Sequence, residues 1–408
     1  MMTSEEKMEI LRTLVAFKSV NGHELPVAQY LQGLLEKAGI ASEIIPAGDD
    51  RAELVATLGS GHPVLAASGH MDVVDVNRDN WKTDPFTLTE MEDGDTLFGR
   101  GSTDMKSGLA AMVIALIELR EENKPLKGTI KLLITSGEEV GQQGAELLQA
   151  KGYMKDVDAL LIGEPSGYLA VYANKGELDL KIKVKGHAAH SSTPALGVNA
   201  VEALLEVLDQ IKDEMHAKMA GTNNDVLGGT IFNIDVIKGG NQVNAIPADA
   251  EAEINIRTIP EFSNAEILTL VNGVIDRFNA GSKAQVSMDV DMDIIPVIGN
   301  KDSSLIKLAQ KVAKPFMAKV EWPEEKLAKT KAMFEAAGIA FCTTELVTLG
   351  VSGGTDASKF LIDHPTGFDY LMLGPGSGTQ HQDNEWVSKS MYLDFVELYK
   401  QLFEEYVG

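Results

Sequence analysis

The sequence predicts an α/β protein with a mainly parallel sheet, interrupted by a smaller inserted α+β domain. The chain has 408 residues, more than one hydrophobic core usually organises, so two domains are expected. In its first and last parts, short and almost wholly apolar runs lie between helical patterns, as in strands buried on both faces. In its middle part the apolar residues alternate strictly, which is typical of strands with one face in water.

Residues 1–176 and 295–408 are predicted to form the two halves of the α/β domain. Helices are expected over residues 11–38 and 108–119. The predicted buried strands are the apolar runs at residues 64–67, 130–134, 159–162 and 370–373. This alternation of strands and helices favours a parallel sheet covered by helices.

Residues 177–294 are predicted to form the inserted domain. Its first strand is the alternating run over residues 177–185. The other strands are expected at residues 230–237, 248–256 and 284–294, and the helices at residues 199–215 and 265–278. The order β-α-β-β-α-β is that of a ferredoxin-like domain, in which helices form a layer on one antiparallel sheet.

The composition excludes several classes of protein. Lys and Arg number 36 against 60 Asp and Glu, which gives a formal net charge of −24 at pH 7. This charge repels nucleic acids and anionic membranes, so neither is expected as a partner. The single cysteine, Cys342, rules out an internal disulfide framework and a cysteine-rich zinc site. The N-terminal segment carries acidic residues and no apolar signal core, so a cytoplasmic protein is expected.

Most of the residues that could perform chemistry come directly after predicted buried strands. They are His70, Asp72, Glu138, Glu139, Glu164 and His381. In open α/β sheets ligands bind at the carboxyl ends of the strands, so four loops are expected to bring these side chains together. Asp104, at the end of a Gly-Arg-Gly-Ser-Thr-Asp segment, comes just before the helix expected at residues 108–119.

A cluster of carboxylates at one sheet edge requires cations, because each carboxylate would raise the pKa of its neighbours. Two divalent metals satisfy this requirement, and imidazole with carboxylate suits zinc. Asp72 lies two residues from His70, so on an extended chain its carboxylate can orient the imidazole. Of the adjacent pair Glu138 and Glu139, one can bind metal and the other can act as the general base. Taken singly, each residue also has an ordinary structural explanation, such as a helix cap or an exposed loop.

Four segments resemble a known enzyme family. They read Ser-Gly-His-Met-Asp at residues 68–72, Gly-Arg-Gly-Ser-Thr-Asp-Met-Lys at 99–106, Ser-Gly-Glu-Glu at 136–139 and Gly-Glu-Pro at 163–165. In this order they are similar to the dinuclear-zinc amidohydrolases and exopeptidases, the family of acetylornithine deacetylase, succinyl-diaminopimelate desuccinylase and glutamate carboxypeptidase. The resemblance covers nearly the whole chain. It implies a zinc-peptidase catalytic domain with an inserted lid, in agreement with the layout indicated by the apolar periods.

The resemblance implies two zinc ions, with cobalt or manganese as alternatives. Asp104 would bridge the two ions. His70 and Glu164 would complete the ligands of one ion. Glu139 and His381 would complete those of the other.

The resemblance also implies roles for the residues around these ligands. Glu138 would be the general base, and Asp72 would orient His70. The peptide bond between Asp104 and Met105 would be cis, which is a feature of the family.

In the lid, the resemblance implies that His190 hydrogen-bonds the scissile carbonyl as charge develops on it. In the family this histidine often comes from the partner subunit, so a homodimer through the lid is expected. The sequence leaves open whether His190 acts in cis or in trans. The implied substrate-binding residues are Asn244, Arg257, Gly354 and Thr355. Arg257 falls on the polar side of its strand, and a guanidinium suits bidentate carboxylate binding.

The expected reaction is hydrolysis of the amide bond of a small N-acyl amino acid. Succinyl-diaminopimelate desuccinylase ranks ahead of acetylornithine deacetylase, and a dipeptidase or carboxypeptidase follows. A glutamate at position 164 favours the deacylases of this family. A non-catalytic, metal-binding regulatory protein is the alternative from a different class. Such a protein would be expected to lack a ligand or the base, and here all of these residues are present.

Overall fold

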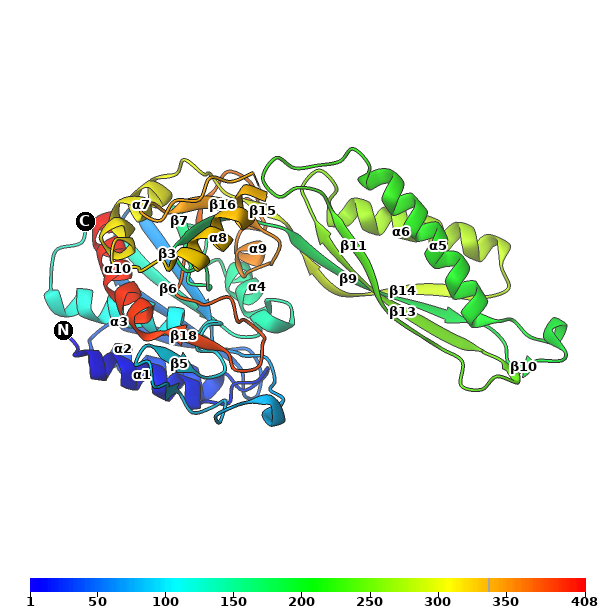
Figure 1. The fold of residues 1–408 in the computed structure, drawn as a ribbon, viewed down its shortest axis with the longest axis horizontal. Helices are drawn as coiled ribbons and strands as arrows, with labels where there is room; N and C mark the ends of the chain where they lie inside the picture. The colour runs from blue at the N-terminus through cyan, green and yellow to red at the C-terminus, as the bar shows by residue number, and fades with distance from the viewer. Residues whose placement is uncertain (337) are drawn as a thin grey trace. The chain divides into compact units, whose positions relative to one another are not determined.

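The computed structural model describes residues 1–336 and 338–408. The chain divides into two compact units (Figure 1). The large unit comprises Met1–Tyr172, Ile298–Leu349 and Thr355–Gly408, and the small unit comprises Ala173–Val297 and Gly350–Gly354. The main segment of the small unit overlaps residues 177–294, where the sequence predicts an insertion.

Residues 350–354 differ from the prediction, which placed them in the second half of the α/β domain. The backbone N–H of Lys175 donates a hydrogen bond to the carbonyl oxygen of Val351 (3.0 Å). A Cβ built on Gly350 would lie 2.8 Å from a side-chain carbon of Leu227. The segment therefore packs with the small unit. The apolar period did not indicate this, because the contacts join residues far apart in the chain.

A mixed sheet forms the framework of the large unit. Within the described residues it has nine strands, in the order β1-β2-β6-β3-β7-β17-β8-β15, and β16 pairs with β8. Its four central strands are parallel neighbours. They are β6 (Thr129–Thr135), β3 (Val64–His70), β7 (Ala159–Ile162) and β17 (Asp369–Met372). These are the four predicted buried strands, so the α/β class with a parallel centre is confirmed.

Other strands flank this parallel centre. They are β1 (Ala41–Pro46) and β2 (Ala52–Gly59) on one side, and β8 (Leu169–Asn174), β15 (Val297–Ile298) and β16 (Val347–Val351) on the other. A separate sheet contains β18 (Trp386–Ser388), β5 (Thr96–Phe98) and β4 (Thr89–Glu90). In it, Trp386 pairs with Phe98. This pairing brings the segment before residue 386 next to the segment that carries Asp104.

Helices cover both faces of the large sheet (Figure 1). Those packed on one face, directly or through a neighbouring helix, are α1 (Ser4–Ala16), α2 (Leu25–Lys37), α3 (Lys106–Glu122), α7 (Ser304–Met317) and α10 (Lys389–Val407). On the other face lie α4 (Gln143–Ala150) and α9 (Ala357–Phe360), and α8 (Glu324–Ala336) precedes β16. Short 3-10 turns are η1 (Arg78–Asn80), η2 (Glu138–Val140) and η3 (Pro194–Leu196). Every residue of α3 from Lys106 to Leu119 is buried, so this helix is at the centre of the core.

The single helix predicted over residues 11–38 is wrong, because α1 and α2 are separate helices. The α1 helix ends where Phe17 turns to an extended backbone (φ −68°, ψ 120°). Gly22 then adopts a φ of 107°, a conformation that favours glycine. Pro26 lies in the first turn of α2, where proline fits without losing a helical hydrogen bond. Both helices bury an apolar face, so the apolar period concealed the break.

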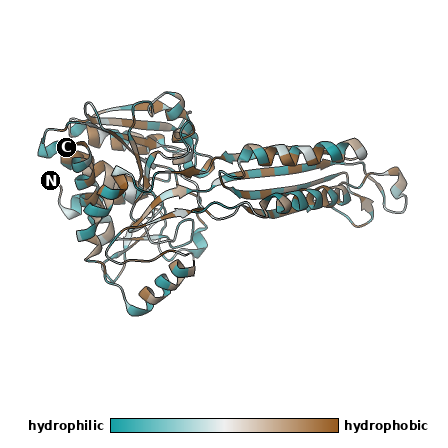
Figure 2. Ribbon diagram, turned by 90° about the horizontal axis from the view of Figure 1, so that it is seen from above, coloured by the Kyte–Doolittle hydropathy of each residue, from teal (hydrophilic) through white to brown (hydrophobic). Residues whose placement is uncertain are grey.

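The small unit contains an antiparallel sheet in the order β11-β13-β9-β14. Its elements are β9 (Gly176–Lys185), α5 (Ala200–Met219), β11 (Ile231–Gly239), β13 (Asp249–Thr258), α6 (Asn264–Gly281) and β14 (Gln285–Ile294). Both helices pack on one face of the sheet, and Figure 2 shows them banded in brown and teal, as amphipathic helices are. This order is ferredoxin-like. A smaller pair consists of β10 (Ala189–His190) and β12 (Ala245–Ile246).

Across residues 1–336 and 338–408, every helix is too short or too polar to span a lipid bilayer.

Candidate metal centre

The predicted cluster lies at the carboxyl edge of the parallel strands in the large unit. His70 is the last residue of β3 and is in register with the last residue of β6. Glu138 and Glu139 follow β6 in the turn η2. Glu164 comes just after β7, and the loop after β17 carries His381. Four loops thus meet at one sheet edge, because the strands that precede them are parallel neighbours.

The structure brings the predicted ligands together in two groups. One group contains His70, Asp104 and Glu164, and the other contains Asp104, Glu139 and His381. Within each group the candidate ligand atoms all lie within 4.8 Å of one another. Because Asp104 belongs to both groups, the arrangement suits two ions that share one carboxylate.

The two oxygens of Asp104 face different histidines. Oδ1 lies 3.1 Å from Nε2 of His70, and Oδ2 lies 3.5 Å from Nε2 of His381. The second carboxylate of each group is also close. Oε1 of Glu164 lies 3.3 Å from Nε2 of His70, and Oε2 of Glu139 lies 2.9 Å from Nε2 of His381. Each imidazole therefore meets two carboxylates through the ring nitrogen that would bind an ion.

In the metal-free protein, the pKa values of several ligand side chains are raised, so these side chains bind protons more tightly than usual. Hydrogen bonds to Asp104 and Glu139 raise the pKa of His381 to about 10. Burial opposes the charged form of His70, but Glu164 and Asp104 outweigh it and raise its pKa well above the usual value. Burial also raises the pKa of Glu164 to about 8. Metal binding would therefore release protons from these side chains.

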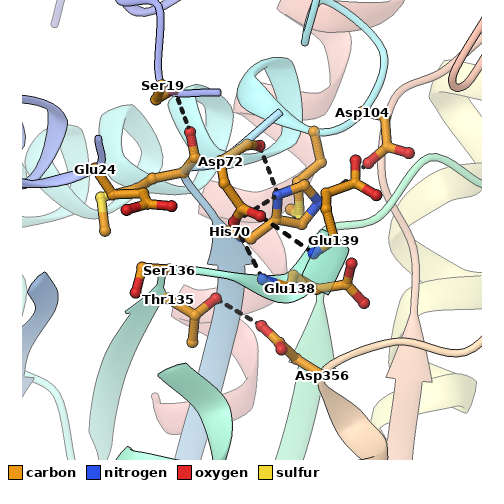
Figure 3. A network of polar contacts seen from close by, with 12 residues as sticks. Ser19, Glu24, His70, Asp72, Asp104, Thr135, Ser136, Glu138, Glu139 and Asp356 are labelled. Carbon is orange, nitrogen blue, oxygen red and sulfur yellow. Dashed lines mark hydrogen bonds and ion pairs between the residues drawn. The ribbon is translucent and has the colours of Figure 1, made fainter. Parts of the chain in front are cut away.

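Asp72 supports both sides of the centre (Figure 3). Its backbone carbonyl oxygen lies 2.9 Å from Nδ1 of His70, whereas its carboxylate Oδ1 is 3.6 Å from that nitrogen. The carboxylate accepts hydrogen bonds from the backbone N–H groups of Glu138 (3.2 Å) and Glu139 (3.1 Å). The sequence predicted that the carboxylate of Asp72 would orient His70. The nearer partner of the ring is the carbonyl of Asp72, and the carboxylate fixes the turn that follows β6.

Glu138 is placed beside the two ligand groups. Among the described residues it belongs to neither of them. Burial raises the pKa of its carboxyl well above the usual value; the charges of Glu164 and Glu139 add to this effect and His70 opposes it. Its Oε1 accepts a hydrogen bond from Nε2 of Gln142 (3.2 Å). A raised pKa suits a carboxyl group that takes up a proton and gives it back near neutral pH.

The residues of the cluster fit a pair of divalent ions. Oε1 of Glu139 is buried and has no hydrogen-bond partner among the described residues, as expected of an oxygen that binds an ion. Imidazole nitrogen and carboxylate oxygen are donors that zinc and related metals accept. Buried carboxylates this close together also require positive charge between them.

In the small unit, the structure brings His190 close to Asn244. The strands β10 and β12 pair, and the backbone N–H of Ser191 donates to the carbonyl oxygen of Asn244 (3.1 Å). Nδ1 of His190 accepts a hydrogen bond from the backbone N–H of Ser192 (3.1 Å). Because Nδ1 is an acceptor, the neutral ring carries its proton on Nε2. The exposed His190 side chain therefore offers Nε2–H as a donor.

Arg257 is already paired within the small unit. It faces Glu177 in register across β13 and β9, and its Nη1 lies 2.6 Å from Oε2 of Glu177. Nδ2 of Asn255 donates to Glu177 (2.9 Å) and to Asp179 (2.7 Å). A substrate carboxylate would therefore compete with Glu177 for the guanidinium.

Gly354 and Thr355 lie on either side of a unit boundary. Thr355 is only 3% exposed. Its Oγ1 lies 3.2 Å from the hydroxyl oxygen of Tyr370 and accepts a hydrogen bond from the backbone N–H of Ala357 (3.3 Å). The hydroxyl thus has internal partners, and the role of Thr355 in substrate binding stays a prediction. Gly354 is half-buried and keeps its predicted role as a proposal.

Sequence reasoning missed two buried acids near the centre. Asp356 accepts a hydrogen bond from the hydroxyl of Thr135 (2.6 Å), at the end of β6, and burial raises its pKa to about 7. Glu385 accepts a hydrogen bond from the backbone N–H of Asp104 (2.9 Å), 281 residues away. Glu385 lies four residues after His381, in a segment that matched the family only as a whole. Proximity to a predicted ligand was the one signal that could have identified it.

The fold and the site together define a metallohydrolase with an α/β framework. The family described as Peptidase family M20/M25/M40 matches residues 66–405, and the chain belongs to this family. The resemblance noted from the sequence motifs is thereby confirmed.

Individual relatives agree with this assignment. The chain is 36% identical to a probable succinyl-diaminopimelate desuccinylase from Staphylococcus epidermidis, over 100% of this chain and 99% of that protein. It is 29% identical to an acetylornithine deacetylase from Proteus mirabilis, over 98% of this chain and 96% of that protein. An M20 family metallo-carboxypeptidase from Sulfolobus solfataricus has a similar structure, with a TM-score of 0.76 and 18% identity over 98% of this chain and 99% of that one. The structural likeness shows a common fold.

Proposed function

We propose that the protein is a zinc-dependent hydrolase that cleaves the amide bond of N-succinyl-diaminopimelate. The reaction class rests on one observation: the half-buried Glu138 lies beside two ligand groups that share Asp104. The substrate is supported by the name of the 36% identical relative. Deacetylation of acetylornithine is the second candidate, which the name of the 29% identical relative supports.

In the proposed reaction, water adds to the amide carbonyl and the C–N bond breaks, giving a carboxylate and an amine. Bound zinc would polarise the carbonyl and lower the pKa of water. Glu138 takes the proton that the attacking water loses. The protonated Glu138 then donates this proton to the leaving nitrogen. The raised pKa of Glu138 brings the carboxyl closer to a balance between these two transfers.

His190 is proposed to stabilise the carbonyl oxygen as negative charge develops on it. The hydrogen bond from the N–H of Ser192 to Nδ1 keeps the proton of the neutral ring on Nε2. Nε2–H then donates to the oxygen, the kind of contact that is stronger in the transition state than in the substrate. Asn244 is proposed to contact the substrate from the neighbouring segment.

We also propose a homodimer that forms through the small unit. The strands β11 and β14 are the edges of its sheet. These edge strands carry exposed apolar side chains, those of Ile231, Ile237 and Val290. Exposed apolar edges favour pairing with another chain, and a second copy would pair across a twofold axis. In such a dimer, His190 of one copy is available to the second copy.

The proposed setting is the cytoplasm, with no nucleic acid or membrane as a partner. A net charge of −24 supports the absence of anionic partners. A single cysteine supports a reducing compartment.

The test is amine release by the zinc-loaded protein from N-succinyl-diaminopimelate, N-acetylornithine and a plain dipeptide, measured side by side. We expect the succinylated substrate to be far ahead. Faster release from N-acetylornithine would move the assignment to the second candidate. No release from any of the three, with two zinc ions bound, would contradict the hydrolase proposal and favour a regulatory metal-binding protein.

A further inference from the structure

One buried side chain holds the turn that carries Asp104. Glu385 is 0% exposed. Its Oε1 accepts hydrogen bonds from the backbone N–H groups of Thr103 (2.7 Å) and Asp104 (2.9 Å). Its Oε2 accepts from the backbone N–H of Gly101 (3.1 Å) and from Nη1 of Arg100 (2.7 Å). Four donors from consecutive parts of one turn therefore converge on a single carboxylate.

Main-chain contacts join the same two segments. The backbone N–H of Gly99 donates to the carbonyl oxygen of Glu385 (3.0 Å). The hydroxyl of Thr103 donates to the carbonyl oxygen of Trp386, and Trp386 pairs with Phe98. The turn over residues 99–104 is thus bound at its start, its middle and its end by residues 385 and 386.

The segment that binds this turn also supplies a metal ligand. His381 lies four residues before Glu385, on a loop where its own φ is 60°, a conformation unusual for a residue other than glycine. The His381 side chain is 56% exposed, whereas that of His70 is 1% exposed. His70 is the last residue of β3, and Glu164 comes two residues after β7, which pairs with β3 in the core sheet. His381 lies farther from its strand, nine residues after the end of β17.

The chemistry of Glu385 shows why a carboxylate is required. A buried carboxylate is tolerated only when its oxygens are hydrogen-bonded. Here each oxygen meets two donors. A glutamine at this position would keep one acceptor oxygen and turn an NH2 group towards two donors. It would fill the same space and lose half of the contacts.

We propose that Glu385 is a positioning residue for Asp104, and that it sets the affinity of the ion held by Asp104, Glu139 and His381. The ion held by Asp104, His70 and Glu164 depends on it much less, because His70 ends β3 and Glu164 closely follows β7. The inference rests on the metal pair of the proposed function and is independent of which amide is cleaved.

The test is cobalt titration of the metal-free protein, followed by calorimetry and visible absorption. We expect Glu385→Gln to lower the affinity for the cobalt ion held by Asp104, Glu139 and His381 about 10- to 100-fold. This is the usual cost of losing a residue that orients a ligand. The affinity for the ion held by Asp104, His70 and Glu164 should change by less than about threefold. The kcat with both metals at saturating concentration should fall while KM stays unchanged, because substrate contacts are intact.

The matched control is Glu118→Gln. Glu118 is also 0% exposed and accepts a hydrogen bond from the N–H of Met2 (3.0 Å). It lies on α3, twelve residues after the first helical residue Lys106, which is about 18 Å along the helix axis at about 1.5 Å per residue. Both cobalt affinities should remain at the wild-type values in this variant.

Three outcomes would overturn the inference or the proposal beneath it. Two cobalt ions bound to Glu385→Gln with wild-type affinities would refute the positioning role. Equal weakening of both ions in a folded variant would refute the asymmetry. If Glu385→Gln does not fold, Glu385→Asp decides the matter under the same criteria, because it keeps the charge and shortens the reach. A wild-type protein that binds no cobalt would instead refute the metal pair of the proposed function.

Discussion

The two units use charged residues in opposite ways. In the large unit, Asp72 and Glu385 are 0% exposed and lie around an acid-rich cluster. In the small unit, exposed pairs such as Lys183 with Asp289 join neighbouring strands of the sheet. Exposed pairs contribute about 0–1 kcal/mol each, because water screens them. Burial raises the cost of each charge and shifts pKa values. Burial, more than the number of charges, therefore distinguishes a reactive cluster from a stabilising surface.

The strongest test of this contrast is Glu138→Gln in the large unit. We expect kcat to fall about 1,000-fold, because the base is lost. Zinc content and KM should stay at the wild-type values, since Glu138 is not one of the candidate ligands. Steady-state kinetics and elemental analysis measure these quantities. The control is Glu146→Gln on the exposed part of α4. If the variant keeps a tenth of the wild-type kcat, Glu138 is not the general base.

A smaller effect is expected from His190→Asn in the small unit. It should lower kcat about 100-fold, because one donor to the developing charge is lost. Metal binding should be unchanged, since His190 lies outside the large unit. His187→Asn, on the same exposed segment, is the control and should be nearly as active as the wild type. If both variants lose activity equally, the loss reflects the segment and not the Nε2–H donor.

The third prediction concerns the pair formed by Arg257 and Glu177. If Arg257 binds a substrate carboxylate, Glu177→Gln should free the guanidinium and lower KM about fivefold, which corresponds to about 1 kcal/mol. Arg257→Lys should raise KM, and kcat should change little in either variant. Asp289→Asn removes a charge from the same sheet and serves as the control. If KM is unchanged in both variants, the ion pair of Arg257 and Glu177 stabilises the sheet and Arg257 does not bind the substrate.

The smallest expected effect concerns a buried acid behind the centre. Glu53 is 0% exposed and accepts hydrogen bonds from the N–H (2.6 Å) and hydroxyl (2.8 Å) of Ser136. Burial raises its pKa from 4.5 to about 8. The folded state therefore binds this proton more tightly than the unfolded state, and its contribution to stability is lost as pH rises from about 4.5 through about 8.

Glu53→Gln cannot ionise, so it should flatten the decline in the free energy of unfolding over this pH range. Denaturant unfolding of the metal-free protein at several pH values measures the slope. Glu36→Gln, on the exposed side of α2, should keep the wild-type slope. Identical slopes in wild type and Glu53→Gln would show that Glu53 ionises normally in the folded protein.

Much of the fold and of the candidate site could be predicted from local sequence patterns. The buried strands were predictable because parallel core strands are apolar on both faces, and each of their ends carried a polar residue such as His70 or Glu164. The break between α1 and α2 was not predictable, because the apolar period continues across it. The packing of residues 350–354 and the role of Glu385 depend on contacts between distant segments. No local pattern records such contacts.

The hydrogen bond between Glu385 and Asp104 has a consequence for the order in which the enzyme is made. A chain synthesised from its N-terminus contains Asp104 for 281 residues before the carboxylate that holds it exists. The whole main segment of the small unit, Ala173–Val297, emerges in between. On the ribosome, the first strands of the core sheet and the main segment of the small unit can therefore fold before the turn at residues 99–104 has its final shape. The nascent chain acquires its finished metal centre late, so its hydrolytic activity is withheld until folding is nearly complete.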